Sequence, residues 1–485
     1  MFKNIIALLV FALACNLGSA ESDGVDFVFS YSAYALNKIS KVASASVVVI
    51  PLGKDNTYCD FIYTKSSGQM KTIHTIPVFG KTNEYQFNFT EVVLLTQYDA
   101  YDFDEQIVKD FRIFAKCTAK VKLIGKISDQ INAWGDMFLI PSSSNAAIQY
   151  VLAMPTSSFG EKGSVSFLPV ASSGQITINI TTFMTDTEYG RNRSYTYDMA
   201  IAQDQRYMSV MFNVFNNASL ILTASSPIMI TLTAPRVTSN SITTDYCGTT
   251  CLSDYVTFMP IGVNEKKCKF ESNQPEENMI TNDFTSRIYI YPTYQDGICN
   301  DKLTATVYDD ITNLARGTTI DISLYGKSSV SLVNKKQTGV LTYDGPLRSY
   351  RQGAILESDG ITAHGHFAHY LPMTKEWVEG NYQFFTLAKD CVLEFYVQGE
   401  PNTNSIDLNH IKIDGTPVTN MTFTTKVIEL FDTNVSQYAV SIKGYGIHTF
   451  VNEGSGKSVG YVICKNVNSP SSGMGYLTGF NMAQV

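Results

Sequence analysis

The chain has 485 residues, of which 44% are hydrophobic and 16% charged, and its formal net charge is −8. This length allows two to four domains with cores of their own. The charge is modest and forms no basic run, so the composition argues against nucleic acid as a partner.

Residues 1–20 have the features of a secretory signal. A single Lys3 precedes an apolar run over 5–14, and small residues stand at Gly18 and Ala20, which predicts cleavage after Ala20. The apolar run is too short to span a bilayer, which takes about 20 residues. Because no second run reaches that length, we expect a secreted, extracellular protein with no membrane span, and Cys15 leaves with the signal.

The remaining cysteines are even in number, as disulfides in a secreted chain require. They are Cys59, Cys117, Cys247, Cys251, Cys268, Cys299, Cys391 and Cys464. Eight cysteines allow 105 pairings, and sequence cannot choose among them. Order along the chain suggests 59 with 117, 247 with 251, 268 with 299, and 391 with 464. Zinc at the 247–251 pair is the alternative, but an oxidising compartment argues against free thiolates there.

Sequons for N-glycosylation point to the same compartment. They begin at Asn88, Asn179, Asn192, Asn217, Asn420 and Asn434. Around Asn179 the segment 175–181 (QITINIT) alternates isoleucine with polar residues. This alternation predicts a half-buried strand whose sequon faces solvent.

Strand-like patterns with a period of two residues run through the chain, punctuated by Asn, Gly, Ser and Pro. Examples are 46–50 (SVVVI), 227–234 (PIMITLTA), 287–291 (RIYIY) and 392–397 (VLEFYV). The best helical candidate is 104–114, where four apolar residues fall roughly on one face. The pattern as a whole predicts an all-β fold.

One pattern recurs three times. The segments 111–123, 220–232 and 339–350 each read as a strand, a short polar break and a second strand. Each is followed by an apolar segment that ends in proline, at Pro141, Pro260 and Pro372. The repeats predict tandem β-sandwich-like units, with a propeller-like arrangement of the repeats as the alternative. The expected divisions are 21–110, 111–235, 236–338 (the Cys-rich unit) and 339–485.

These segments resemble the N-terminal domain of the mucus-associated IgG Fc-binding protein family. The resemblance rests on 134–141 (WGDMFLIP), 224–230 (ASSPIMI), 251–260 and the Gly/Tyr-rich closing stretch around 475–480 (GYLTGF), and it covers about 110–485. The first 110 residues match less clearly, and the glycine usual after the proline is present only as Gly262. The resemblance implies an extracellular, adhesive or mucus-associated protein without enzymatic activity. It does not establish binding of immunoglobulin.

The segment 454–460 (GSGKSVG) matches the nucleophile elbow of serine hydrolases around Ser458. An elbow needs a strand before the serine and a helix after it, whereas here a glycine-rich turn precedes and a strand follows. A phosphate loop is excluded because Val451 stands where its first glycine belongs. We therefore interpret the segment as a hairpin turn and expect no catalytic residue.

Two groups of residues could be metal ligands. His364, His366 and His369 could share a strand face, but no carboxylate or cysteine nearby completes the set. We expect them to be surface histidines. The acidic residues Asp99, Asp102, Asp104 and Glu105 lack the glycine and the spacing of a calcium loop, so we interpret them as a solvated acidic loop. No metal and no cofactor is predicted.

Together these features predict a secreted, disulfide-linked, glycosylated binding protein of an extracellular or mucus-like matrix. Its partners would be extracellular proteins or glycoconjugates. The alternatives are a secreted hydrolase that uses Ser458 or a metal at the three histidines, and a structural matrix component without a specific ligand.

Overall fold

A computed structural model describes residues 20–482 except for 36–37, 98–102, 158–160, 185–186, 213–217, 240–251, 264–274, 293–302, 312–313, 324–327, 345–346, 357–361, 400–407, 432–433 and 455. The fold is all-β and consists of tandem sandwich-like units, as predicted. Short α- and 3-10 helices connect the strands.

Unit 1 contains β1 (Gly24–Phe29), β2 (Tyr31–Tyr34), β3 (Ser44–Pro51), β4 (Cys59–Thr64), β5 (Met70–Thr75), β6 (Glu84–Phe87), α1 (Phe89–Val92), β7 (Val93–Thr96), β9 (Ile113–Asp129) and β10 (Trp134–Ile140). The long strand β9 passes through both layers of the sandwich. Its first half pairs with β1 and β4, and its second half pairs with β3 and β10. β5 and β6 extend the two layers outward from β4 and β3.

Unit 2 repeats this topology. It contains β8 (Phe103–Val108), the 3-10 turn η1 (Ser143–Asn145), β11 (Ala147–Ala153), β12 (Glu161–Pro169), β13 (Gln175–Met184), β14 (Thr187–Asp198), β15 (Gln205–Phe212), β16 (Ala218–Val237) and β17 (Asp254–Phe258). The long strand β16 pairs with β11 and β13 through its first half, and with β12 and β17 through its second half. β8, which precedes β9 in sequence, adds to the edge of this unit beside β15.

Units 3 and 4 divide the long strand in two. Unit 3 contains β18 (Glu276–Thr281), β19 (Thr285–Pro292), β20 (Thr304–Asp309), β21 (Thr318–Asp321), β22 (Ser328–Ser331), β23 (Gln337–Thr342), β24 (Leu347–Leu356) and β25 (Ala363–Tyr370). Here β23 pairs with β18 and β20, while β24 pairs with β19 and β25. β23 and β24 are therefore the counterparts of the two halves of β9.

Unit 4 contains η2 (Thr374–Glu376), β26 (Val378–Glu379), β27 (Tyr382–Thr386), β28 (Asp390–Gln398), η3 (Leu408–His410), β29 (Ile411–Ile413), β30 (Thr416–Pro417), η4 (Val418–Asn420), β31 (Phe423–Ile428), β32 (Val435–Ile442), β33 (Gly446–Asn452), β34 (Lys457–Lys465) and β35 (Gly473–Leu477). β33 pairs with β27 and β29, and β34 pairs with β28 and β35. This copy of the repeat was not predicted from the sequence.

The structure corrects the predicted repeat in one respect. In units 1 and 2 the polar segment does not break the strand, because β9 and β16 continue through it with side chains that are more exposed than those on either side. Polar residues occur there because the strand leaves one layer and enters the other. In units 3 and 4 the chain does leave the strand at the corresponding place.

The sheets also divide the chain elsewhere than the sequence predicted. The boundary at 110/111 falls just before β9, and those at 235/236 and 338/339 fall within β16 and β23. The boundaries at 110/111 and 338/339 placed the long strand at the start of a unit, whereas its pairings place it near the end. The boundary at 235/236 left nearly all of β16 at the end of its predicted unit, where its pairings also place it. The best helical candidate, 104–114, is not a helix: 103–108 form β8, and the strand β9 begins at Ile113. Cross-strand pairing with β15 outweighs the weak helical periodicity, and Ile107 is left exposed.

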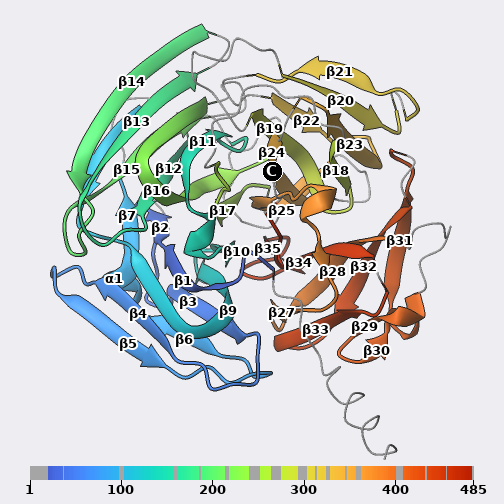
Figure 1. The fold of residues 1–485 in the computed structure, drawn as a ribbon, viewed down its shortest axis with the longest axis horizontal. Coiled ribbons are helices and arrows are strands. Elements are labelled where there is room, and N and C mark those ends of the chain that lie inside the picture. Colours follow the sequence, from blue (N-terminus) through green and yellow to red (C-terminus); the bar gives the residue numbers. More distant parts are fainter. Residues whose placement is uncertain are drawn as a thin grey trace, which may run out of the picture.

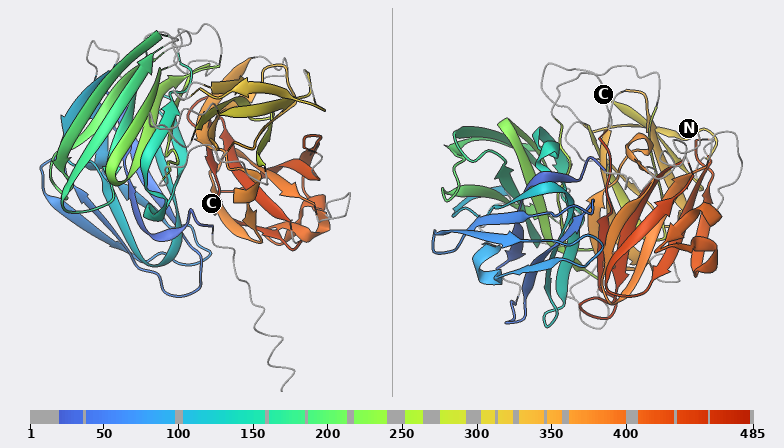
Figure 2. Two further views of the ribbon diagram at one scale, coloured as in Figure 1. Left: turned by 45° about the horizontal axis from the view of Figure 1, so that its top comes forward. Right: turned by 60° about the horizontal axis from the view of Figure 1, so that its bottom comes forward.

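The units follow one another around a common centre (Figure 1). The strands that close them, β10, β17, β25 and β35, contact one another in that order, and β35 returns to β10. Figure 2 shows units 1 and 2 on one side of this centre and units 3 and 4 on the other. Each unit is a two-layered sandwich, as the first prediction has it. The ring of contacts between the closing strands is a feature of the alternative prediction, a propeller-like arrangement of the repeats.

Glycines allow the closing strands to meet. A Cβ on Gly473 would lie 2.2 Å from the carbonyl oxygen of Gly365, so β35 and β25 approach too closely for a side chain there. A Cβ on Gly475 would clash with the ring of Phe367 at 2.6 Å. The glycine-rich end of the chain is therefore a requirement of packing at the centre.

Apolar side chains fill two large cores, one mainly from units 1 and 2 and one mainly from units 3 and 4. The second core also includes Val48, Ile124 and Met137 from unit 1, so it extends across the ring. Within the described residues we find no helix long and apolar enough to cross a membrane.

Candidate functional site

Ser458 is not placed as a nucleophile. It lies inside β34, is fully buried, and its Oγ donates a hydrogen bond to the carbonyl oxygen of Val378 at 3.5 Å. The hairpin interpretation was only partly correct, because the turn before β34 joins strands of different layers and Lys457 and Ser458 belong to the strand. The chain before Lys457 separates β33 from β34, which are the two halves of the long strand in unit 4.

The three histidines lie on β25, but two of them are core residues and not surface residues, which corrects the prediction. His366 Nε2 accepts a hydrogen bond from the Ser239 amide at 3.0 Å, and His369 Nε2 accepts one from Arg351 Nε at 2.7 Å. Burial lowers the pKa of His366 to about 3, and it lowers the pKa of His369 well below its ordinary value. Within the described part of the chain, no three His, Cys, Asp or Glu side chains gather as metal ligands.

Of the predicted acidic loop, Asp99 and Asp102 lie outside the described residues. Asp104 and Glu105 lie on β8, where Glu105 forms an ion pair with Arg206 of β15. Asp104 accepts a hydrogen bond from Gln106. These two carboxylates thus belong to a strand edge and not to a loop.

Disulfides join Cys59 to Cys117 and Cys391 to Cys464, the first and last pairs suggested by chain order. Each links the partner strands of one layer, β4 with β9 and β28 with β34. Cys247, Cys251, Cys268 and Cys299 lie outside the described residues. So does Asn217, whereas the sequon asparagines at 88, 179, 192, 420 and 434 are all exposed. The prediction that Asn179 faces solvent from a half-buried strand is confirmed.

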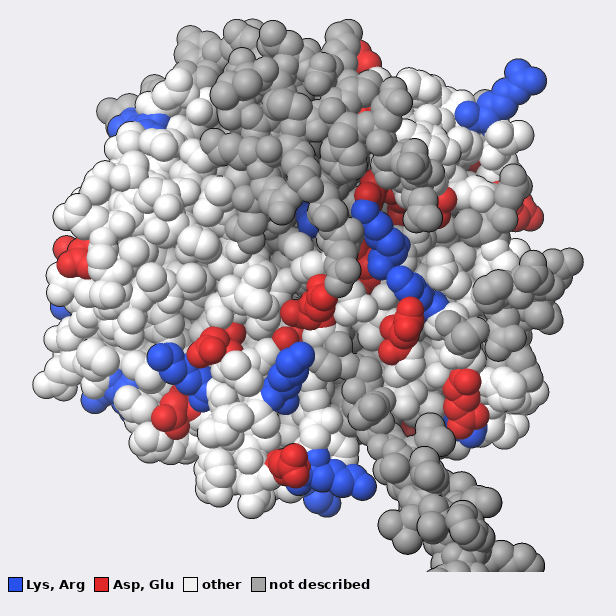
Figure 3. Space-filling model, viewed as in Figure 1, with Lys and Arg blue, Asp and Glu red and all other residues white. Residues whose placement is uncertain are grey.

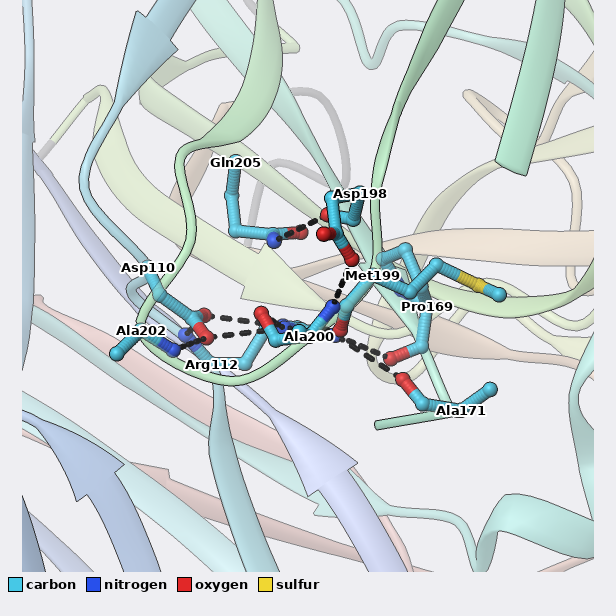
Figure 4. Close-up of polar contacts among 9 residues, drawn as sticks. All are labelled: Asp110, Arg112, Pro169, Ala171, Asp198, Met199, Ala200, Ala202 and Gln205. Atoms are coloured by element: carbon cyan, nitrogen blue, oxygen red, sulfur yellow. Dashed lines mark hydrogen bonds and ion pairs between the residues drawn. The ribbon is translucent and has the colours of Figure 1, made fainter. Parts of the chain in front are cut away.

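Buried ion pairs hold neighbouring units together. Between units 1 and 2, the guanidinium of Arg112 binds both carboxylate oxygens of Asp110 at 2.9 Å (Figure 4). It also donates to the carbonyl oxygens of Pro169 and Met199 at 2.9 Å, while Asp110 accepts from the Ala202 amide. Both charged side chains are fully buried, so the cluster is a structural clamp that a ligand cannot reach.

A second clamp joins units 3 and 4. Arg351 Nη1 binds Glu394 Oε2 at 2.7 Å, and the other oxygen of Glu394 accepts a hydrogen bond from Tyr396 at 2.9 Å. The guanidinium also lies 4.2 Å from the ring centroid of Tyr461. All of these groups are buried.

Two buried carboxyl groups serve the centre of the ring. Asp136 on β10 accepts hydrogen bonds from the amides of Thr257 on β17 and Gly475 on β35, and Asp254 on β17 accepts one from Gly473. The closing strands are not paired as a ladder here, so these carboxyl groups accept the hydrogen bonds that backbone carbonyl groups would accept in a sheet. Burial raises the pKa of Asp136 and that of Asp254 well above their ordinary values.

The seam where unit 4 meets unit 1 remains open as a groove of about 210 Å³, which we call the seam groove. It is lined by Lys126, Ser128, Gln130, Leu387, Ala388, Lys389, Tyr445, Val467, Asn468 and Met474. Leu387, Val467 and Met474 are nearly or fully buried and supply apolar surface, whereas Gln130 and Lys389 are exposed. The residues come from five places in the fold: the ends of β9, β27, β32 and β34, and β35 itself.

Tyr445, the aromatic residue of the seam groove, is held by a cluster of polar contacts around Glu84, which we call the hub. Tyr445, whose side chain is 49% exposed, donates its hydroxyl hydrogen to Glu84 of unit 1. Glu84 also accepts from Ser46 Oγ and forms an ion pair with Lys126, each at 2.5 Å. Burial would raise the pKa of Glu84, but the Lys126 ammonium and these hydrogen bonds hold it below its ordinary value. The ring of Tyr445 also meets Phe385 edge-on at 5.2 Å between centroids, so it is held at two points.

Asn468 supplies an unused amide. Both its Oδ1 and its Nδ2 are buried and lack a hydrogen-bond partner among the described residues. Leaving a buried polar atom unpaired costs about 1–3 kcal/mol. Lys389 makes no ion pair with any described residue and provides a free cation beside the groove. The seam groove thus combines the half-exposed ring of Tyr445 with an amide and a cation whose side chains have no polar partner among the described residues.

A larger groove of about 650 Å³ lies where the first and last described segments meet. Its polar side chains hold the chain start in place: Asn145 Nδ2 donates to the carbonyl oxygen of Glu21 at 3.1 Å, and Ser143 Oγ donates to that of Asp26 at 3.0 Å. Lys122 nearby is buried in an ion pair with Asp23 at 2.9 Å. We therefore assign this region to closure of the ring.

The surface carries no large patch of one charge on the face shown in Figure 3. Lysine and arginine side chains lie beside aspartate and glutamate, and the area over unit 2 is nearly uncharged.

Comparison with known proteins assigns no family. No family model matches the chain, and no curated protein matches it. Among solved structures, the arabinofuranosyltransferase AftD from Mycobacteria aligns at 10% identity and a TM-score of 0.10. That alignment covers 70% of this chain and about a third (34%) of AftD, and it carries no information on fold or function.

Proposed function

We propose that the chain is a secreted, disulfide-linked, glycosylated binding protein of an extracellular or mucus-like matrix, and that it binds the sugar of a glycoconjugate in the seam groove. The observation that carries this is the half-exposed ring of Tyr445, held by Glu84 and Phe385 beside the unpaired amide of Asn468. A fixed ring can stack on the apolar face of a pyranose without losing further conformational freedom on binding.

The polar groups suit hydroxyl-rich ligands. An amide offers a donor and an acceptor side by side, which matches two neighbouring hydroxyl groups of a sugar. The volume of about 210 Å³ admits one sugar ring and not an extended chain. Lys389 and Gln130 at the exposed side can reach substituents of that ring.

Membership of the IgG Fc-binding family remains part of this proposal, since it agrees with an extracellular binding role. The hydrolase alternative loses its support, because Ser458 is buried in a strand and His366 and His369 are engaged in the core. A matrix component without a ligand is retained as an outcome of the experiment below.

The test is a glycan array followed by calorimetric titration of the best sugar with the secreted, glycosylated protein. We expect the Tyr445→Ala variant to bind about two- to thirteenfold more weakly, since an aromatic stacking contact contributes about 0.5–1.5 kcal/mol beyond its buried area. Tyr58→Ala is the matched control, because Tyr58 is equally exposed, at 49%, and does not line the seam groove. No sugar binding by the wild type, together with concentration-dependent self-association, would favour the matrix component.

A further inference from the structure

An exposed apolar tip lies at one end of unit 1, formed by the loop 38–43 and the turn 130–132 between β9 and β10. We call it the unit 1 tip. Ile131 is 70% exposed, Val42 56% and Ile39 37%. Three exposed aliphatic side chains thus lie on two loops that adjoin at Asp129, and exposed apolar side chains that gather in one region are typical of interaction sites.

The two loops are held together as one rigid piece by Asp129. Its carboxylate accepts hydrogen bonds from the Ser40 amide and Oγ at 2.6 and 2.7 Å, from the Ile131 amide at 3.1 Å, and from Asn132 Nδ2 at 2.9 Å. Trp134 Nε1 adds a hydrogen bond to the carbonyl oxygen of Lys38 at 3.2 Å. Because the loops are already ordered, presenting the apolar side chains costs little further entropy.

Cations alternate with the apolar residues of the tip. Lys38 and Lys41 flank Ile39 and precede Val42, and both lysines are exposed. Neither forms an ion pair with another residue in the described part of the chain. The one carboxylate tied into the tip, that of Asp129, is buried and engaged in the hydrogen bonds above. The exposed charge of these loops is therefore positive, although the whole chain is acidic.

We propose that the unit 1 tip docks on the surface of an anionic lipid bilayer, with Ile39, Val42 and Ile131 in the boundary between headgroups and acyl chains. Lys38 and Lys41 would then meet the anionic headgroups, where each lysine contributes about a fivefold factor in affinity. Protein interfaces are enriched in aromatic residues and arginine and depleted in lysine. The aliphatic and lysine composition of the tip favours the bilayer over a protein partner.

The experiment is flotation of the full-length secreted protein with vesicles of pure phosphatidylcholine or of phosphatidylcholine with about a third phosphatidylserine, at about 0.1 M salt. We expect binding to the mixed vesicles, a loss of at least tenfold for Ile131→Asp, and a loss of about tenfold or more for Lys38→Gln/Lys41→Gln. Ile311→Asp is the matched control, since Ile311 is 57% exposed in a turn of unit 3. It should bind as the wild type does.

A second measurement tests whether the unit 1 tip enters the membrane. Trp134 lies beside the tip, so brominated lipids should quench its fluorescence in the wild type more than in Ile131→Asp. Failure of the wild type to bind anionic vesicles, or equal binding by Ile131→Asp, would overturn the proposal and leave the tip to a protein partner. Because these vesicles contain no sugar, the outcome is independent of the function proposed for the seam groove.

Discussion

The junction between units 3 and 4 and the seam between units 4 and 1 each combine a glutamate, a basic side chain and a tyrosine hydroxyl, but in different surroundings. In the junction, Glu394 is held by Arg351 and by the hydroxyl of Tyr396, and all three are buried. In the seam, Glu84 is held by Lys126 and by the hydroxyl of Tyr445, and water reaches part of each side chain. Burial turns such a triad into a clamp, whereas partial exposure leaves its tyrosine available to a ligand.

The largest effect should follow from breaking the buried triad. Arg351→Met leaves the Glu394 carboxylate unpaired in the core, which costs about 3–5 kcal/mol. Urea unfolding followed by fluorescence would measure this loss. A loss below about 1 kcal/mol would show that water reaches the junction and would remove the contrast with the seam.

The control for this prediction removes both charges. Arg351→Met/Glu394→Leu should be considerably more stable than the single variant, because no buried charge is left without a partner. Equal losses in the single and double variants would mean that packing, and not the unpaired charge, explains the effect.

The disulfide of unit 4 is the next most sensitive element, since this unit contributes to both the junction and the seam. Replacing Cys391 and Cys464 by alanine opens a loop of 73 residues and should cost about 2–5 kcal/mol. The same change at Cys59 and Cys117, which are 58 residues apart, should cost a similar amount because loop length enters only logarithmically. Denaturant midpoints of the two double variants test this. A loss confined to one pair would show that the two units do not unfold together.

Buried and exposed groups should also respond differently to pH. The folded-state pKa of His366 lies below its unfolded value, so its contribution is complete above about pH 6.5 and is lost as pH falls toward 3. The slope is about 1.4 kcal/mol per pH unit. Asp136 and Asp254 act in the opposite direction, since their raised pKa values give stability that is lost as pH rises.

Comparison of two histidine variants isolates the contribution of His366 to the pH dependence of stability. His366→Gln should remove about 1.4 kcal/mol per pH unit from the acid dependence of the unfolding free energy between pH 6.5 and 4.5. His74→Gln is the control, because the His74 side chain is 77% exposed and its ion pair with Asp60 lies at the surface. An unchanged slope for His366→Gln would place the acid sensitivity in other groups.

The sequence predicted the strands well because alternation of apolar and polar residues is a local pattern that each segment carries by itself. Alternation at 175–181 and the apolar run at 46–50 are local signals, and both segments are strands. The repeat was visible for the same reason in units 1 to 3. It was missed in unit 4 because the glycine-rich segment before Ser458 was interpreted as a hairpin turn and not as the break between β33 and β34.

The seam groove could not be predicted, because its residues are brought together only by closure of the ring. Glu84 and Tyr445 are 361 residues apart in sequence, and neither lies in a motif that indicates binding. The burial of His366 and His369 was equally hidden, since a strand with alternating histidines gives no sign that both of its faces are covered. Contacts between units leave no periodic trace in the sequence, whereas contacts within a strand do.

The smallest effect on stability, and the most informative for function, is expected at the seam. Glu84→Gln weakens a partly exposed ion pair and should cost about 1 kcal/mol or less. It should nevertheless weaken sugar binding several-fold, because the Tyr445 hydroxyl loses its charged acceptor and the ring is no longer fixed. Glu91→Gln is the matched control: Glu91 also accepts from a lysine and a tyrosine, Lys71 at 3.1 Å and Tyr63 at 3.0 Å, away from the seam groove. Similar stability losses in the two variants, with loss of affinity only in Glu84→Gln, would show that the hub positions the ring. Equal affinities would mean that Tyr445 needs no support from unit 1.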